Sequence, residues 1–352
     1  MSSSSLHTRL CELLGMKAPI LQTGMGWVAT PELVAGACNA GAFGFLAAAG
    51  LPVDEVERRI HRTRELTDRP FGVNYLMDAP GAEEITALIT AGGVRAAGYN
   101  RAPSSALIDR LKAAGVLCVP TCGAPRHVQK AEQLGADIAI VQGGEGGGHT
   151  GPIPTSLLVP ACADAVDIPI VAAGGFKDGR GLVAALAWGA AGIAMGTRFL
   201  MTAESPVPAN TYARYEKAGL GDVIVTREID GMPQRVVVNE LVRELEGANA
   251  LKRLAFALRN AMELRRVSGA SLVELLRAGL AMRKSEGLSR SQLLMAANAP
   301  ILARRAMNEG DPVGGYLPSG SVAGLLDDRP TCAELIARIM EEAEATLKRL
   351  GA

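Results

Sequence analysis

One glycine-rich stretch contains the residue best suited to move a proton. Six of the nine residues from 143 to 151 are glycine, and His149 lies near the end of the stretch. Imidazole is the side chain that exchanges protons most readily near neutral pH, and no bulky aliphatic residues surround this one in the sequence. The stretch is not a P-loop, because no Gly-Lys-Ser/Thr follows it. We therefore interpret His149 as a proton-transfer group, with a structural histidine in a mobile loop as the alternative.

A second group of glycines could bind an anion through the main chain. Gly174 and Gly175 follow one continuous apolar run, and Gly196 follows the next. Without side chains, they allow backbone N–H groups to approach a phosphate, and a helix beginning near Asp178 would add its positive end. Tight turns alone would explain either position. Their occurrence after two successive runs favours a phosphate site.

A basic segment occurs in a chain whose formal net charge is zero. Residues 251–290 hold nine Lys or Arg residues, among them Arg265 and Arg266, against three glutamates. A solvated helix face would explain this excess. The functional interpretation is a binding patch for an anionic substrate handle, such as the phosphates of coenzyme A, to which Arg265 and Arg266 would contribute.

Other chemistries and partners find little support. Cys118 and Cys122 lack a second ligand pair, so we expect no metal site, and no Gly-x-Ser-x-Gly elbow occurs. Zero net charge gives no field for binding nucleic acid or membranes. The N-terminus lacks an apolar signal region, and the six scattered cysteines are expected to be buried thiols. These features predict a cytoplasmic protein with a small-molecule substrate, and they are compatible with a homo-oligomer.

The elements that would position these residues repeat regularly. Eight short strands are expected, mostly as continuous apolar runs, which is typical of a parallel sheet buried on both faces. They are Pro19–Gln22, Phe43–Ala47, Phe71–Leu76, Arg95–Gly98, Val116–Thr121, Ile138–Gly143, Ile168–Ala173 and Gly192–Thr197. Amphipathic stretches separate most of them. Eight such units predict a (β/α)8 TIM barrel, whose active site lies at the carboxyl ends of the strands.

A doubly wound dinucleotide fold is the competing architecture. Residues 24–29 fit the loose Gly-x-Gly-x-x-Ala pattern, but no acidic residue ends the second strand, where a ribose partner is required. We therefore favour the barrel, over residues 1–208. Residues 209–317 predict a smaller helical domain covering the substrate, with helices near 241–258, 271–281 and 291–297. Residues 318–352 are expected to return to the barrel and end in an amphipathic helix over Cys332–Leu350.

Five motifs in order resemble the nitronate monooxygenase (2-nitropropane dioxygenase) family. They are Pro19–Trp27, Phe71–Asn74, Gln142–Gly151, Ala172–Gly181 and Met195–Phe199. The resemblance covers nearly the whole chain and implies a barrel that holds FMN non-covalently beneath a helical second domain. It also implies that His149 is the catalytic base.

The resemblance further assigns cofactor contacts by position. The residues near the flavin ring would be Gln22, Thr23, Gly24, Met25 and Asn74. Gln142 and Gly147 would lie on the next wall of the site. The phosphate would be held by Gly174, Gly175, Gly196 and Thr197. Two positions depart from the family: some nitronate monooxygenases carry Lys where Thr121 stands and Asp where Gln142 stands. These departures weaken the expectation of nitronate oxidation itself.

Three segments resemble one actinobacterial branch of the family more closely. They are residues 143–151, Asp230–Val236 and Ser291–Asn298. The branch includes a flavin-dependent oxidoreductase of steroid ring catabolism that acts on CoA thioesters. This resemblance implies dehydrogenation of a ring carbon next to an activating carbonyl. The alternatives are nitronate oxidation with O2, an enoyl-thioester reductase and a non-catalytic flavin-binding protein.

Overall fold

Eight parallel strands of the chain close into a barrel, confirming the predicted fold class. The computed structural model describes residues 6–100, 105–268, 295 and 298–351. The barrel strands follow one another in chain order, with β9 pairing back to β1. They are β1 (Ile20–Gln22), β2 (Phe43–Ala47), β3 (Gly72–Tyr75), β4 (Ala96–Asn100), β5 (Leu117–Cys122), β6 (Ala139–Gln142), β8 (Ile170–Ala173) and β9 (Gly192–Met195).

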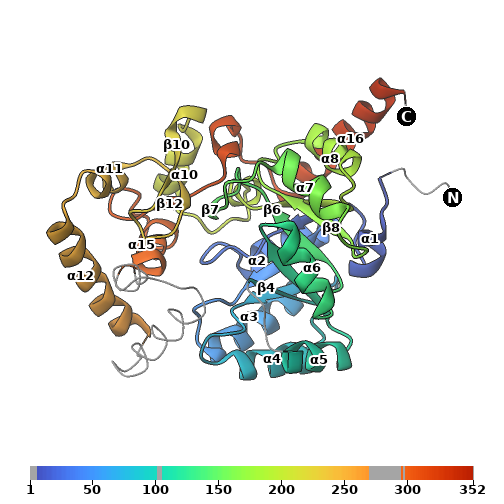
Figure 1. Ribbon diagram of the computed structural model, residues 1–352, viewed down its shortest axis with the longest axis horizontal. Helices are drawn as coiled ribbons and strands as arrows, with labels where there is room; N and C mark the ends of the chain where they lie inside the picture. Colours follow the sequence, from blue (N-terminus) through green and yellow to red (C-terminus); the bar gives the residue numbers. More distant parts are fainter. Residues whose placement is uncertain (1–5, 101–104, 269–294, 296–297, 352) are drawn as a thin grey trace.

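Apolar side chains fill both faces of the barrel wall, which explains the continuous apolar runs. Inside, Phe43 and Phe45 of β2 meet edge to face with ring centroids 5.2 Å apart. Leu10 and Leu14 of a short helix α1 (Arg9–Leu14) join the same cluster. Helices cover the outside of the barrel (Figure 1): α2 (Pro31–Asn39), α3 (Val53–Leu66), α4 (Ala82–Ala91), α5 (Ser105–Ala113), α6 (Pro125–Gln133), α7 (Thr155–Ala163), α8 (Gly179–Ala187) and the single turn α9 (Thr197–Leu200).

The part of the chain after residue 208, called the second unit below, contains strands of a small antiparallel sheet as well as the expected helices. Its central strand β11 (Gln234–Val237) pairs with β10 (Val223–Thr226), β12 (Leu317–Pro318) and β7 (Gly148–His149). The sequence did not predict this sheet, because its strands are only two to four residues long. Strand β7 belongs to the barrel's glycine stretch, so the sheet joins the two units.

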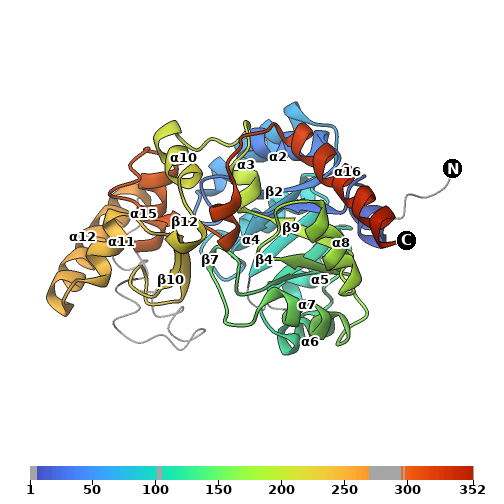
Figure 2. The same cartoon turned by 90° about the horizontal axis from the view of Figure 1, so that it is seen from above.

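The helices of the second unit lie beside the barrel (Figure 2). They are α10 (Ala209–Glu216), α11 (Glu240–Glu246), α12 (Ala250–Ser268) and α15 (Asn298–Met307), with single 3-10 turns at Leu220–Asp222 and Ser321–Leu325. The helix expected near 241–258 is therefore two helices, broken at Gly247–Asn249. The helix expected over 271–281 and most of that over 291–297 lie outside the described residues.

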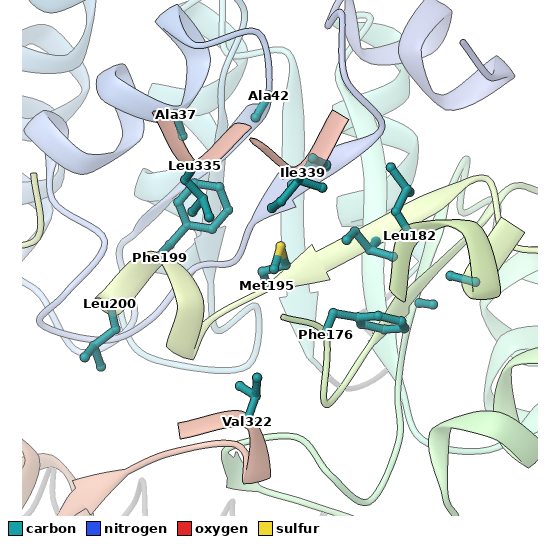
Figure 3. Packing of buried hydrophobic residues seen from close by; sticks show 14 of the residues in the cluster. Ala37, Ala42, Phe176, Leu182, Met195, Phe199, Leu200, Val322, Leu335 and Ile339 are labelled. Atoms are coloured by element: carbon teal, nitrogen blue, oxygen red, sulfur yellow. The ribbon is translucent and has the colours of Figure 1, made fainter. Parts of the chain in front are cut away.

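The last helix, α16 (Cys332–Leu350), packs against α8 and α2 of the barrel. It begins with a capping box, in which Thr331 and Glu334 satisfy each other's backbone amides. Figure 3 shows Leu335 and Ile339 of this helix meeting Phe199 and Met195. The C-terminal segment thereby buttresses the end of β9, where Gly196 and Thr197 follow.

The six cysteines are buried and unpaired, as expected. Burial raises the pKa of the Cys122 thiol to about 12, so a thiol at the barrel rim stays protonated and serves packing. No helix within the described residues has the length and apolar character needed to cross a membrane.

Candidate active site

Polar contacts from both units hold the glycine-rich stretch after β6. The Glu145 carboxylate accepts hydrogen bonds from the Thr155 amide at 2.9 Å and the Thr155 hydroxyl at 2.6 Å. The Arg235 guanidinium on β11 donates two hydrogen bonds to the Gly144 carbonyl, at 2.7 and 3.1 Å. Burial lowers the pKa of Arg235, while the nearby Glu145 charge opposes that shift. The stretch is therefore tied to the second unit.

His149 is fixed in space by β7 and by a buried carboxylate. Its backbone pairs with Gln234 of β11, and its carbonyl accepts a hydrogen bond from Gln142 Nε2 at 2.8 Å. Its ring Nε2 lies 2.7 Å from Oδ2 of Asp230. The His149 side chain is 59% exposed, whereas that of Asp230 is 6% exposed. One edge of the imidazole thus contacts the protein, and the rest of the ring is accessible to a substrate.

Asp230 is a site residue that the sequence reading did not single out. It comes from the second unit, in the turn before β11, where the Met232 amide donates to its Oδ1 at 3.0 Å. The Gln234 side-chain amide donates to its Oδ2 at 2.6 Å. Asp230 begins the second of the three segments that resemble one branch of the family, and that was the only signal available.

Two buried asparagines brace the turn that presents Asp230. Asn298 of α15 donates from Nδ2 to the Ile229 carbonyl at 2.8 Å. Its own Oδ1 accepts a hydrogen bond from Asn260 of α12 at 2.9 Å. Both asparagines are almost completely inaccessible to solvent. The position of the Asp230 turn therefore depends on these two helices.

Removing the Asn298 side chain should destabilise the protein measurably. An Asn298→Ala variant leaves the Ile229 carbonyl and the Asn260 amide buried without these partners. We expect the free energy of unfolding to fall by about 2 kcal/mol or more. Chemical denaturation followed by circular dichroism measures this, with Asn308→Ala at an exposed position as the control, expected to cost less than about 0.5 kcal/mol. Equal losses in the two variants would contradict the bracing role.

Bare main-chain amides face the mouth of the barrel after β8 and β9. The amides of Gly174, Gly175 and Gly196 donate to no acceptor in the part of the chain that the structure describes. Gly174 and Gly175 have φ angles of 110° and 80°, which side-chain-bearing residues rarely adopt. A Cβ at Gly196 would lie 3.1 Å from the Thr23 hydroxyl. These glycines are half-buried or exposed, so a phosphate could reach their amides.

The start of α8 does not contribute the free positive end expected near Asp178. The Gly179 amide donates to Glu342 of α16 at 3.0 Å, and the Arg180 amide donates to Asp178 at 3.1 Å. Protein carboxylates thus already occupy these two amides. Only the glycines after β8 and β9 therefore remain as candidate donors to the expected phosphate.

Thr197 begins α9 and is braced from the C-terminal segment. Its hydroxyl accepts a hydrogen bond from the Gly320 amide at 2.9 Å. The next residue, Arg198, is 3% exposed and pairs with Asp328 at 2.7 Å. Gly147, from the glycine-rich stretch, lies against the same segment, because a Cβ there would meet the Gly320 amide nitrogen at 2.5 Å. Gly147 and Thr197 therefore meet around Gly320.

The loop after β1 lies against the end of β3. A Cβ on Gly24 would overlap Asn74, at 2.4 Å from its Cβ. The half-buried Asn74 side chain has no hydrogen-bond partner among the described residues and is free to bind a ligand. Thr23 and Met25 are also half-buried. The residues assigned to the ring contacts thus gather at the carboxyl ends of β1 and β3.

Gln22 faces a different way from its neighbours in this loop. Its side chain is completely buried, and its amide donates to the Thr23 carbonyl. Its Oε1 has no hydrogen-bond partner within the described structure and lies beside Gly44, near α2. Any contact of Gln22 with a ring at the barrel mouth must therefore come from its backbone.

The residues at the barrel mouth fit the group that the resemblance implies. Unpaired backbone amides suit the phosphate of a flavin nucleotide, and the free Asn74 amide suits the polar edge of its ring. The expected substrate residues Arg265 and Arg266 lie on α12, but their side chains are outside what the structure describes.

Comparisons with known proteins show the family of this chain. The nitronate monooxygenase family model matches residues 7–100 and 89–342. The chain is 51% identical over 349 residues to "(3aS,4S,5R,7aS)-5-hydroxy-7a-methyl-1-oxo-octahydro-1H-indene-4-carboxyl-CoA dehydrogenase" of Rhodococcus jostii, with 99% of each chain covered. The Mycobacterium tuberculosis protein of the same name is 49% identical over 350 residues, with the same coverage.

A solved structure shares both the barrel and the second unit. FabK from Thermotoga maritima superposes with a TM-score of 0.80 at 30% identity, covering 98% of this chain and 99% of that one. The match thus extends well beyond the barrel. Together with the family model and the relatives, it shows that this chain is an oxidoreductase and belongs to the nitronate monooxygenase family.

Proposed function

We propose that this protein is an FMN-dependent dehydrogenase that acts on a CoA thioester of a ring acid. The observation that carries the proposal is the imidazole of His149, held 2.7 Å from Asp230 at the barrel mouth, beside the residues proposed to bind flavin. Near half identity over the whole chain to two CoA-thioester dehydrogenases supports the substrate class. Their name describes a fused-ring acid joined to coenzyme A, as in steroid ring degradation.

The proposed reaction uses the acidity of a C–H bond beside a thioester carbonyl. His149 takes the proton from that carbon, while the adjacent carbon loses hydride, so a carbon–carbon double bond forms and the substrate is oxidised by two electrons. When bound, FMN supplies the acceptor for that hydride. The chain's own contribution is to hold the substrate's C–H bond against the imidazole and to bind the phosphate of FMN through its main-chain amides.

Gly174, Gly175, Gly196 and Thr197 would hold the FMN phosphate in this proposal. Gln22, Thr23, Gly24, Met25 and Asn74 would lie along the ring, with Gln142 and Gly147 on the next wall. The free amides after β8 and β9 and the unpaired Asn74 side chain support these roles.

A panel of substrates tests the reaction: ring-bearing CoA thioesters, alkyl nitronates with O2, and NADH or NADPH with an unsaturated thioester.

Each arm of the panel has a distinct consequence. We expect turnover with the CoA thioesters and an artificial electron acceptor. Oxidation of nitronates alone would identify the protein as a nitronate monooxygenase. This is the second candidate function, and the match to the family model favours it. Consumption of reduced nicotinamide alone would indicate an enoyl-thioester reductase, and a flavin that none of these compounds reduces would indicate a binding protein.

Reversing two charges on α12 should weaken only substrates that carry coenzyme A. In an Arg265→Glu/Arg266→Glu variant we expect KM for a CoA thioester to rise about tenfold, because charge-assisted phosphate contacts are lost. Steady-state kinetics measures this, with Lys348→Glu/Arg349→Glu at the exposed end of α16 as the matched control. If KM rises equally in both variants, or in neither, Arg265 and Arg266 do not bind the substrate handle.

A further inference from the structure

We infer that Asp230 is a positioning residue that fixes the tautomer of His149, so that Nδ1 is the atom that receives the substrate proton. The inference rests on the proposed role of His149 as the base. It assigns a function to a residue of the second unit and names the reactive atom of the imidazole.

The contact between the two side chains determines where the ring proton lies. An ionised carboxylate only accepts hydrogen bonds, and Asp230 Oδ2 lies 2.7 Å from His149 Nε2. A neutral imidazole making this bond must carry its hydrogen on Nε2. Its Nδ1 then has a free lone pair, and that atom forms no hydrogen bond with any described residue. The accessible nitrogen is therefore the basic one.

The carboxylate is held on both oxygens, so it cannot turn away from the ring. The Met232 amide donates to Oδ1 at 3.0 Å, and Gln234 Nε2 donates to Oδ2 at 2.6 Å. The Gln234 side chain is completely buried, and its backbone pairs with that of His149 across β7 and β11. The antiparallel pairing of β7 with β11 thus helps to hold the His149 imidazole at its distance from the Asp230 carboxylate.

These contacts predict that an isosteric change reverses the tautomer. In Asp230→Asn, the Met232 amide still requires an oxygen at the Oδ1 position, which directs the new NH2 group toward His149 and Gln234. The Gln234 amide then turns over, so that its Oε1, which has no partner among the described residues, accepts a hydrogen bond from this NH2 group. An NH2 group can only donate, so Nε2 must become the acceptor and the ring proton must move to Nδ1. The imidazole stays in place but loses its base at the accessible nitrogen.

Nitrogen NMR on the flavin-loaded protein, with histidine labelled by 15N, tests the tautomer directly. The chain has four histidines, and the signal missing from His149→Ala assigns the one of interest. At a pH where the ring is neutral, we expect a pyridine-type Nδ1 and a protonated Nε2 in the unmodified protein, exchanged in Asp230→Asn. Asp222→Asn, an exposed position in the same unit, should leave the spectrum unchanged.

Kinetics provides a second readout. We expect Asp230→Asn to lower kcat about 100-fold or more with little change in KM, because substrate binding is retained and the base is lost. A protonated Nδ1 in the unmodified protein would overturn the inference, even if His149 proves essential. Conversely, the predicted tautomer with no CoA-thioester turnover would leave the tautomer standing and refute the proposed reaction.

Discussion

Replacing His149 with alanine is expected to lower turnover about 1,000-fold while the protein keeps its flavin. The variant removes the imidazole that lies 2.7 Å from Asp230 and leaves the amides after β8 and β9 untouched. Because the C–H bond beside a thioester does not ionise unaided, proton removal becomes the slow step. Rapid mixing of the variant with a CoA thioester under nitrogen measures the rate of flavin bleaching.

A second histidine provides the control for this variant. His127 lies on α6, on the outside of the barrel, and is exposed. His127→Ala should bleach at the unmodified rate and retain the same flavin content. A His149→Ala variant that bleaches as fast as the unmodified protein would rule out His149 as the base, whatever the substrate.

Placing a carboxylate at Gly196 is expected to yield protein with less than about a tenth of the normal flavin. Gly196 has a φ angle of −99°, which any residue adopts, so Gly196→Asp should fold normally. Its Cβ would point toward the hydroxyl of Thr23, at 3.1 Å. The added negative charge would lie beside the amides proposed to bind a phosphate dianion. The absorbance ratio of flavin to protein in the purified variant measures the loss.

The same change at another strand end separates charge repulsion from general damage. Gly123 follows β5 on the same end of the barrel, and a Cβ there meets no atom of the described residues within 4 Å. Gly123→Asp should therefore bind flavin normally. Full flavin content in Gly196→Asp would contradict the proposed phosphate site, and Gly196→Ala, with a smaller loss, distinguishes size from charge.

The barrel could be predicted from the sequence because its strands are locally encoded. Runs such as Phe43–Ala47 are buried along their whole length, and each is followed by a helix of the same chain segment. A strand that is buried on both faces is apolar at every consecutive residue, so it can be recognised from a short stretch of sequence. The number of strands and their order were therefore predictable from the pattern, and eight units favoured closure into a barrel.

The site was only partly predictable because its decisive contacts are not local. His149 was found from its glycine surroundings, but Asp230 lies 81 positions further along the chain. Their meeting depends on the pairing of β7 with β11, two strands too short to show an alternating pattern. Likewise, Glu342 reaches the start of α8 from 163 positions away.

Anaerobic titration of the yellow protein with a ring-bearing CoA thioester, followed by flavin absorbance, tests the central claim most directly. The account predicts stoichiometric bleaching with one equivalent of thioester, and an unsaturated thioester as the product. A protein that is colourless and takes up no added FMN, or a bound flavin that stays oxidised with every thioester, would contradict it.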